Sequence, residues 1–256
     1  WAAHKPLVGV DHLVGHLLSV FLRFEEAAAP EPVSYPYLGL LASGGHTALY
    51  RVDGPLPEQI EELGATRDDA AGEAYDKVAK LLGLGYPGGP VIDRLAREGN
   101  PEGIPLSAPM QRRDSLEFSF SGLKTNVMRW VGEHGLPGND QTLRDLCATF
   151  QRRVVDSLMN KALAAAAREG LGTIVLAGGV AANSELRQRG SRLAEARGVR
   201  LVVPSLRACT DNAAMIAFAG AARAARGADD SGQLEMSPHT ILPRKTRKGR
   251  GARSDG

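Results

Sequence analysis

"TIVLAGGVAANSELRQRGSRLAEARG", residues 173–198, decides the fold. Its apolar first residues predict a buried strand, the two glycines a tight turn, and the polar stretch that follows a helix. The next stretch, "RLVVPSLRACTDNAAMIAFAGAARAAR" at residues 200–226, repeats this plan of strand, loop and helix. Strands that alternate with helices are typical of an α/β fold with parallel strands.

The other expected elements follow from hydrophobic spacing and from glycine and proline positions. In chain order they are a strand at 5–10 leading into a helix over about 11–24 with Asp11 as its N-cap, two strands within 37–54, two helices within 68–98, irregular chain at 99–122, and a long helix over about 142–169.

Composition points to an ordinary globular protein of the cytoplasm. Of the 256 residues, 43% are hydrophobic and 23% are charged. No apolar run reaches the roughly 18 residues that a membrane span needs, so we expect no membrane association. The start of the chain lacks the cationic and apolar segments of a signal peptide. Two distant cysteines fit a reducing compartment better than a disulfide framework.

Positive charge is concentrated at the C-terminal end. The stretch "PRKTRKGRGARSDG" holds six Lys or Arg residues and one Asp, so the rest of the chain carries a net charge of −3. Its Gly, Ser and Arg content cannot bury a core, and residues 241–256 are expected to be a disordered basic tail. Two uses stay open, a solvated tail that aids solubility and a weak, salt-sensitive contact with RNA phosphates.

Two histidines four residues apart, His12 and His16, lie in an otherwise apolar helix pattern, "VDHLVGHLLS". On a helix this spacing places both side chains on one face, where they could grip one cation. The alternative is a pair of core imidazoles bonded to backbone carbonyls. A zinc protease would need Glu directly after the first histidine, and Leu13 occupies that position.

Glycine turns and acidic residues suggest a nucleotide cleft. "LLASGGHT" and "VLAGGVAAN" each place two glycines after an apolar strand, where backbone N–H groups can point at phosphate oxygens. Ordinary tight turns remain the alternative. Asp76 and Asp93 flank the turn "YPGGP" and could hold a ribose, or could belong to a solvated helix face. Asp211 lies at a strand-to-helix switch, either as the N-cap of the next helix or as the oxygen ligand of a His-His-carboxylate site.

Six stretches, in their order along the chain, are similar to the TsaD-type tRNA threonylcarbamoyltransferase family. They are "VDHLVGHL", "LLASGGHTALY", "DDAAGEAYDKVAKLLGLGYPGGP", "FSFSGLKTNV", "LAGGVAANSELR" and "CTDNAAMIA". The resemblance runs from about Val10 to Ala217, and the loop around 28–35 and the basic tail lie outside it.

The resemblance implies the two-lobed α/β fold of actin, Hsp70 and sugar kinases (ASKHA), with a nucleotide between the lobes. Family members begin with a strand and an acidic loop of the first lobe, so this chain is expected to start within that lobe. The first lobe would then be incomplete and the second complete. We expect residues 1–37 to be a remnant of the first lobe, 38–240 a nucleotide-binding lobe with a helical insertion, and 241–256 the tail. The helix after Asp11 should expose the face that packs on the missing sheet.

The resemblance also implies a reaction, in which a threonylcarbamoyl group moves from threonylcarbamoyl-AMP to the N6 amine of the adenosine just 3′ of the anticodon, in tRNAs that read ANN codons. It implies one divalent metal ion, iron or else zinc, held by His12, His16 and Asp211, and an AMP- or ATP-type nucleotide in the cleft. Substrate contacts carry over to Leu41, Ala42, Ser43, Gly44, Gly45, Asp76, Gly89, Asp93 and Asn183. Expected partners are tRNA, a TsaB-like paralogue and a TsaE-like small ATPase.

Three other functions fit the sequence less well. A sugar kinase or ATPase of the same fold leaves the two-histidine helix without a role. A metallopeptidase lacks its water-activating base, because Leu13 follows His12. A non-catalytic paralogue that serves as a scaffold should have lost the metal ligands, yet His12, His16 and Asp211 are all present.

Overall fold

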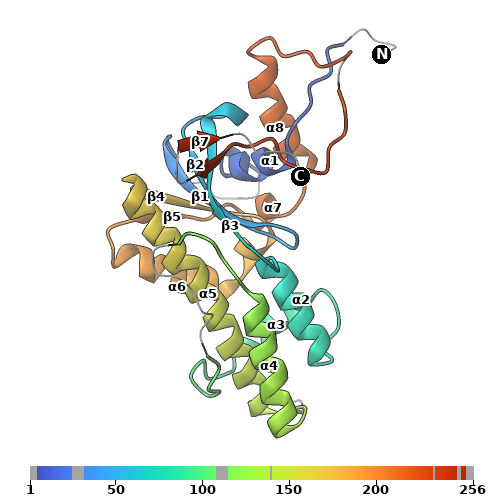
Figure 1. Ribbon diagram of the computed structural model, residues 1–256, viewed down its shortest axis with the longest axis vertical. Helices are drawn as coiled ribbons and strands as arrows, with labels where there is room; N and C mark the ends of the chain where they lie inside the picture. The colour runs from blue at the N-terminus through green and yellow to red at the C-terminus, as the bar shows by residue number, and fades with distance from the viewer. Residues whose placement is uncertain are drawn as a thin grey trace.

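The computed structural model describes residues 5–24, 32–107, 115–138, 140–232, 234–246 and 249–251. A seven-stranded mixed sheet has the strand order β5-β4-β1-β2-β3-β6-β7 (Figure 1). The strands are β1 Tyr37–Ala42, β2 Thr47–Val52, β3 Ile60–Ala65, β4 Thr173–Ala177, β5 Arg200–Val202, β6 Arg244–Thr246 and β7 Gly249–Gly251.

Parallel and antiparallel pairing divide the sheet. The predicted parallel strands are confirmed at β1, β4 and β5, which pair in parallel. β2 pairs antiparallel with both β1 and β3, so the chain from β1 to β3 is a meander. The sheet is therefore of the α/β type that was expected, with an antiparallel part beside the parallel one.

Helices cover both faces of the sheet. They are α1 His12–Leu18, α2 Ala71–Leu81, α3 Gly88–Ala96, α4 Ser121–His134, α5 Gln141–Glu169, α6 Ser184–Glu195, α7 Leu206–Cys209 and α8 Ala213–Ala224, with 3₁₀ turns η1 Ser19–Phe21, η2 Pro57–Gln59 and η3 Gly179–Ala182. One core cluster packs α2 to α6 against one sheet face, and a second packs α1 and η1 against the other. In Figure 1, α2 to α5 extend below the sheet and α8 lies above it. No helix among the described ranges is both long and apolar enough to cross a bilayer.

The predicted strand at 5–10 is wrong. This segment has no regular structure and is tied to residues near the C-terminal end of α8 instead. Gly9 donates its N–H to the Asp230 carboxylate at 2.8 Å, and Asp230 donates its own N–H to the Leu7 carbonyl at 2.7 Å. These bonds satisfy the backbone without a neighbouring strand, which the local sequence could not reveal.

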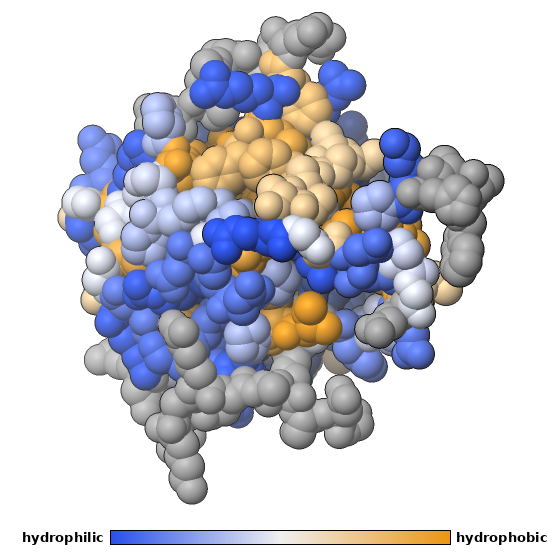
Figure 2. All heavy atoms as spheres, turned by 90° about the horizontal axis from the view of Figure 1, so that it is seen from above, coloured by the Kyte–Doolittle hydropathy of each residue, from blue (hydrophilic) through white to orange (hydrophobic). Residues whose placement is uncertain are grey.

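The exposed face predicted for the helix after Asp11 is also wrong. Leu13, Val14 and Leu17 of α1 are at most 3% exposed, because α1 lies between the sheet and α8. The outer side of α8 is the exposed one, and Phe218 there is 37% exposed. Figure 2, which views the molecule from the end where α8 lies, shows apolar side chains gathered on this face.

Residues 244–246 and 249–251 of the predicted disordered tail form β6 and β7 of the sheet, which corrects that expectation for these residues. Leu242 is fully buried in the core beside α1. Arg244 forms an ion pair with the buried Glu62 of β3 at 3.3 Å, and Lys245 forms one with Glu169 at 2.8 Å. Acidic groups from distant parts of the chain thus meet these basic residues and order them. Residues 247–248 and 252–256 of the tail lie outside the described residues.

Candidate functional site

The metal-ligand candidates come together at the start of α1. The Asp11 carboxylate caps this helix by accepting from the Leu13 N–H at 2.9 Å, as predicted. The Asp211 carboxylate, from the loop between α7 and α8, lies 2.9 Å from His16 Nε2 and 3.5 Å from His12 Nε2. One donor atom from each of the three residues lies within 4.8 Å of the other two.

This donor set fits a single metal ion. Two imidazole nitrogens and a carboxylate oxygen bind at about 2.0–2.2 Å from zinc, so neighbouring ligand atoms of one ion lie about 3 Å apart. The separations from Asp211, 2.9 and 3.5 Å, are close to that spacing, and the three donor atoms all lie within 4.8 Å of one another. Two histidines and one carboxylate are also the ligand set of many iron(II) sites.

The structure does not show the alternative, a pair of core imidazoles bonded to backbone carbonyls. The His16 side chain is 3% exposed, but its Nδ1 has no hydrogen-bond partner among the described residues, and the His12 side chain is 51% exposed. Asp211 does not cap α8, since Asn212 takes that role and accepts from the Met215 N–H at 2.9 Å. The Asp211 side chain is 75% exposed and directed at the histidines.

Burial favours the neutral form of the His16 imidazole, which is the form that binds a metal cation. Desolvation lowers the pKa of His16, the nearby His12 lowers it further, and Asp211 acts in the opposite direction. A lowered pKa keeps the imidazole neutral at physiological pH, which is the form that binds a metal. His46, which follows the turn at Ser43, contributes a smaller lowering.

Close packing of α1 on α8 brings the two histidines of α1 close to Asp211, which precedes α8. A Cβ on Gly15 would lie 3.1 Å from Ile216 Cδ1 and 3.2 Å from Met215 Cγ. Both neighbours belong to the first turn of α8, directly after the loop that carries Asp211. Glycine between the two histidines thus permits the approach that brings Asp211 to them.

The turn at Ser43 presents free backbone donors. The Ser43 N–H donates to the His46 carbonyl at 2.8 Å, and the Ser43 carbonyl accepts from the Gly72 N–H at 3.1 Å. Among the described residues nothing accepts from the N–H groups of Gly44 and Gly45, and a Cβ on either would have no neighbour within 4 Å. An anion can therefore come close to this part of the backbone.

Leu41 and Ala42 position the turn but offer no side chain to a ligand. Both lie in β1, paired with β2 and β4, and both are at most 1% exposed. Gly178, at the end of β4 with a φ of +84°, approaches so closely that a Cβ would lie 2.5 Å from the Ala42 carbonyl oxygen. The carboxyl ends of β1 and β4 thus meet at the turn, where α/β folds bind their ligands.

Replacing Gly44 with alanine should weaken nucleotide binding without affecting folding. The new methyl group meets no protein atom, so the free energy of unfolding should change by less than about 0.5 kcal/mol. The methyl group would occupy the space that an approaching phosphate needs, and AMP affinity should fall about ten-fold, or about 1.4 kcal/mol. Isothermal titration with AMP measures this. Gly132→Ala, which is equally unobstructed but on α4, should leave AMP affinity unchanged, and an unchanged Gly44→Ala affinity would contradict the role of the turn.

The "YPGGP" turn is attached to α2. Asp76 Oδ1 accepts from the Gly88 N–H at 2.8 Å, which leaves Oδ2 for another donor. A Cβ on Gly88 would lie 2.7 Å from the Tyr75 carbonyl oxygen, whereas one on Gly89 would meet nothing within 4 Å. Gly88 is therefore the packing glycine, and Gly89 faces open space as a substrate contact requires.

Asp93 and Asn183 are more buried than a simple ligand contact needs. Asp93 is 7% exposed and Asn183 is 8% exposed. The Asn183 amide donates to Gln151 Oε1 at 2.7 Å and to the Tyr75 hydroxyl at 3.4 Å, so both of its hydrogens are engaged. Its carbonyl oxygen caps α6 by accepting from the Leu186 N–H.

Sequence reasoning missed Gln151 and Ser184, which hold these two residues. A signal was present, because Gln151 is a polar residue on the apolar, buried face of α5 beside Phe150 and Val154. Such a residue needs a partner inside the protein. The sequence alone does not say which residue that partner is.

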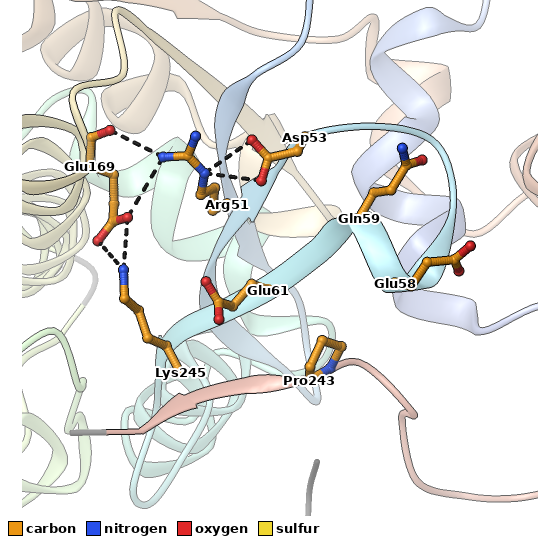
Figure 3. Close-up of a pocket in the computed structure, with 8 residues that line it drawn as sticks. All are labelled: Arg51, Asp53, Glu58, Gln59, Glu61, Glu169, Pro243 and Lys245. Atoms are coloured by element: carbon orange, nitrogen blue, oxygen red, sulfur yellow. Dashed lines mark hydrogen bonds and ion pairs between the residues drawn. The ribbon is translucent and has the colours of Figure 1, made fainter. Parts of the chain in front are cut away.

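A separate cavity of about 570 Å³ lies at the opposite end of the sheet (Figure 3). Arg51 in its wall pairs in register with Leu38, whereas the Ser43 turn follows the other end of β1. Arg51 binds Asp53 at 3.0 Å and Glu169 at 3.7 Å, and Lys245 binds Glu169 as well. None of the predicted site residues lines this cavity.

Residues 1–218 match the family model described as "TsaD: tRNA N6-adenosine threonylcarbamoyltransferase". A protein of that name from Sorangium cellulosum (strain So ce56) is 60% identical over 99% of this chain and 72% of its own length. One from Geobacter metallireducens is 51% identical over 92% of this chain and 66% of its own length.

A solved structure supports the fold. The crystal structure of full-length HypF in the phosphate- and nucleotide-bound form superposes with a TM-score of 0.60, at 15% identity, over 88% of this chain and 36% of that protein. At this identity the likeness concerns the fold alone. It agrees with the α/β architecture described above.

Proposed function

We propose that this chain, which belongs to the tRNA N6-adenosine threonylcarbamoyltransferase family, carries the metal and nucleotide sites of such an enzyme and transfers a threonylcarbamoyl group to tRNA. The donor is threonylcarbamoyl-AMP, and the acceptor is the N6 amine of the adenosine 3′ of the anticodon in tRNAs that read ANN codons. The observations that carry this proposal are the His12, His16 and Asp211 group and the unobstructed Ser43–Gly45 turn.

The three ligands would hold one divalent ion, iron or else zinc. Such an ion supplies a Lewis acid that offsets negative charge on phosphate and carbamoyl oxygens. His16 would contribute a neutral, buried imidazole, and the exposed side chains of His12 and Asp211 would hold the ion from the solvent side. Leu13 is 3% exposed and directed into the core, so no residue at that position could activate water as in a peptidase.

The chain's own groups would bind the rest of the donor. The N–H groups of Gly44 and Gly45 would donate to its phosphate or carbamoyl oxygens, as in an oxyanion hole. Oδ2 of Asp76 would accept from a ribose hydroxyl beside the open face of Gly89. Asp93 of α3 and the turn at Asn183, which precedes α6, would line one side of the nucleotide site.

Transfer then needs no nucleophilic side chain. The adenosine amine nitrogen forms a bond to the carbamoyl carbon and loses one proton to water, the bond from that carbon to the phosphate oxygen breaks with its electron pair going to the oxygen, and AMP leaves. The adenosine has to be unstacked from the anticodon loop to reach the site, as in most recognition of single-stranded RNA. We further propose that a TsaB-like paralogue and a TsaE-like ATPase assist the reaction in the cell.

Expression of this chain, joined to the first-lobe segment of a relative, in cells depleted of their own enzyme tests the proposal. Threonylcarbamoyladenosine in digested tRNA is quantified by mass spectrometry for the wild-type chain and for His16→Ala. We expect the nucleoside to return with the wild-type chain only. A folded wild-type chain that holds its metal but restores no nucleoside would contradict the proposal and would favour a kinase or ATPase of the same fold.

A further inference from the structure

The buried amide of Gln151 joins two predicted nucleotide contacts that belong to different elements. Gln151 lies on α5 and is 3% exposed. Its Nε2 donates to Asp93 Oδ1 at 3.2 Å, and its Oε1 accepts from Asn183 Nδ2 at 2.7 Å. Asp93 comes from α3, and Asn183 is the residue that caps α6. One hydrogen-bonded row thus connects three helices next to the predicted cleft.

We propose that Gln151 is a positioning residue, which fixes the Asp93 carboxylate and the turn at Asn183 in the orientation that binds the nucleotide. This inference rests on the proposed function. An amide donates at one atom and accepts at the other, so it serves a carboxylate and an amide donor at once. A carboxylate or an apolar side chain of the same length loses one or both of these bonds.

The surrounding bonds show which oxygen of Asp93 is left for a ligand. Oδ1 also accepts from the Ser184 N–H at 3.1 Å and from its hydroxyl at 2.7 Å, so with Gln151 it has three donors. Oδ2 meets only Arg97 among the described residues, at 2.9 Å, and the Arg97 side chain is 64% exposed. Gln151 and Ser184 therefore anchor the inner oxygen, and the outer one is oriented toward the exposed rim.

A glutamate at position 151 would place two carboxylates within hydrogen-bond distance. Two such groups cannot both stay ionised, so the pair would hold a proton and its behaviour would depend on pH. The charged and titratable groups around the row are Asp93 and Arg97 from α3, Tyr75 from α2, Arg152 from α5 and Glu185 from α6. Burial raises the pKa of Tyr75 well above its usual value, with additions from Asp93 and Glu185, so this phenol stays neutral.

The test compares Gln151→Glu and Gln151→Met with the wild-type chain. The dissociation constant of AMP is measured by titration calorimetry, and KM for threonylcarbamoyl-AMP and kcat are measured in the transfer assay. For Gln151→Glu, we expect AMP binding to be about ten-fold weaker at about pH 8 and within about three-fold of wild type near pH 6, where the pair is protonated. Gln151→Met should be about ten-fold weaker at both pH values, with KM raised more than kcat is lowered.

Thr149→Val is the matched control. Thr149 is fully buried on the same helix and donates to the Asn100 carbonyl at 3.5 Å, away from the row. Removal of the Thr149 hydroxyl should lower the midpoint temperature of thermal unfolding and leave AMP affinity unchanged at both pH values. If Gln151→Glu does not fold, the AMP affinity of Gln151→Met tests the positioning role on its own.

The outcomes separate the inference from the function. Wild-type affinity for AMP in folded Gln151→Met, or no pH dependence in folded Gln151→Glu, would overturn the positioning role and leave the proposed function intact. A wild-type chain that does not bind AMP would overturn both.

Discussion

Replacing Asp211 with alanine is expected to remove the bound metal and to abolish transfer. Asp211 supplies the only oxygen of the three-ligand group, and two imidazoles remain without it, one of them half exposed. Loss even of an outer partner of a metal ligand lowers affinity about 10–100-fold, so loss of the ligand itself should cost at least about 100-fold. Metal content after dialysis, measured by plasma mass spectrometry, and threonylcarbamoyladenosine in tRNA should fall together.

The fold should survive this change. The Asp211 side chain is 75% exposed, and α8 keeps its cap because Asn212 provides it. Glu195→Ala, which removes an exposed carboxylate from α6, is the control and should retain both metal and activity. A folded Asp211→Ala chain with a full equivalent of metal would refute the assignment of the three ligands.

Replacing Gly72 with valine is expected to damage both stability and nucleotide binding. Even a Cβ at this position would lie 2.7 Å from the Ser43 carbonyl oxygen and 2.8 Å from Gly44 Cα. These are backbone atoms, so α2 and the glycine turn would have to separate, with loss of the bond from the Gly72 N–H to Ser43. Overpacking of this kind costs about 3 kcal/mol, and displacement of the turn should weaken AMP binding by about 100-fold.

Urea denaturation and AMP titration measure the two effects. Gly44→Ala is the matched comparison. Gly44 belongs to the turn that Gly72 contacts, but a Cβ on Gly44 would meet no atom within 4 Å. Stability should fall for Gly72→Val and stay constant for Gly44→Ala. A Gly72→Val chain with unchanged stability and unchanged AMP affinity would show that the contact between α2 and the turn has no such role.

Local spacing was sufficient to predict the elements that carry the site. The i and i+4 histidines, the Asp11 cap, the turn between β1 and β2, and the strand-turn-helix unit after β4 all depend on residues close in sequence. α5 was predicted for the same reason, and it ends at Gly170 with a φ of +66°. The structure also separates the roles of Asp211 and Asn212, because Asn212 caps α8 and the Asp211 carboxylate is left for the histidines.

Elements stabilised by distant residues escaped prediction. α4 has no capping side chain of its own, and Asp68 caps it from another segment by accepting from the N–H groups of Phe120 and Ser121 at 2.8 and 3.2 Å. β3 contains adjacent Glu61 and Glu62, both buried, which breaks the alternation expected of a strand. Glu62 is paired by Arg244 of β6, which a local sequence pattern cannot show.

The most direct measurement follows a labelled threonylcarbamoyl group from threonylcarbamoyl-AMP in a purified reaction. It contains the chain, iron(II) or zinc, an unmodified tRNA that reads an ANN codon, and the TsaB-like and TsaE-like proteins of a relative. We predict that the label moves to the adenosine 3′ of the anticodon with one AMP released per transfer, that a chelator stops the reaction, and that added metal restores it. Release of AMP with no label on the tRNA, or transfer that persists in Asp211→Ala, would contradict the account.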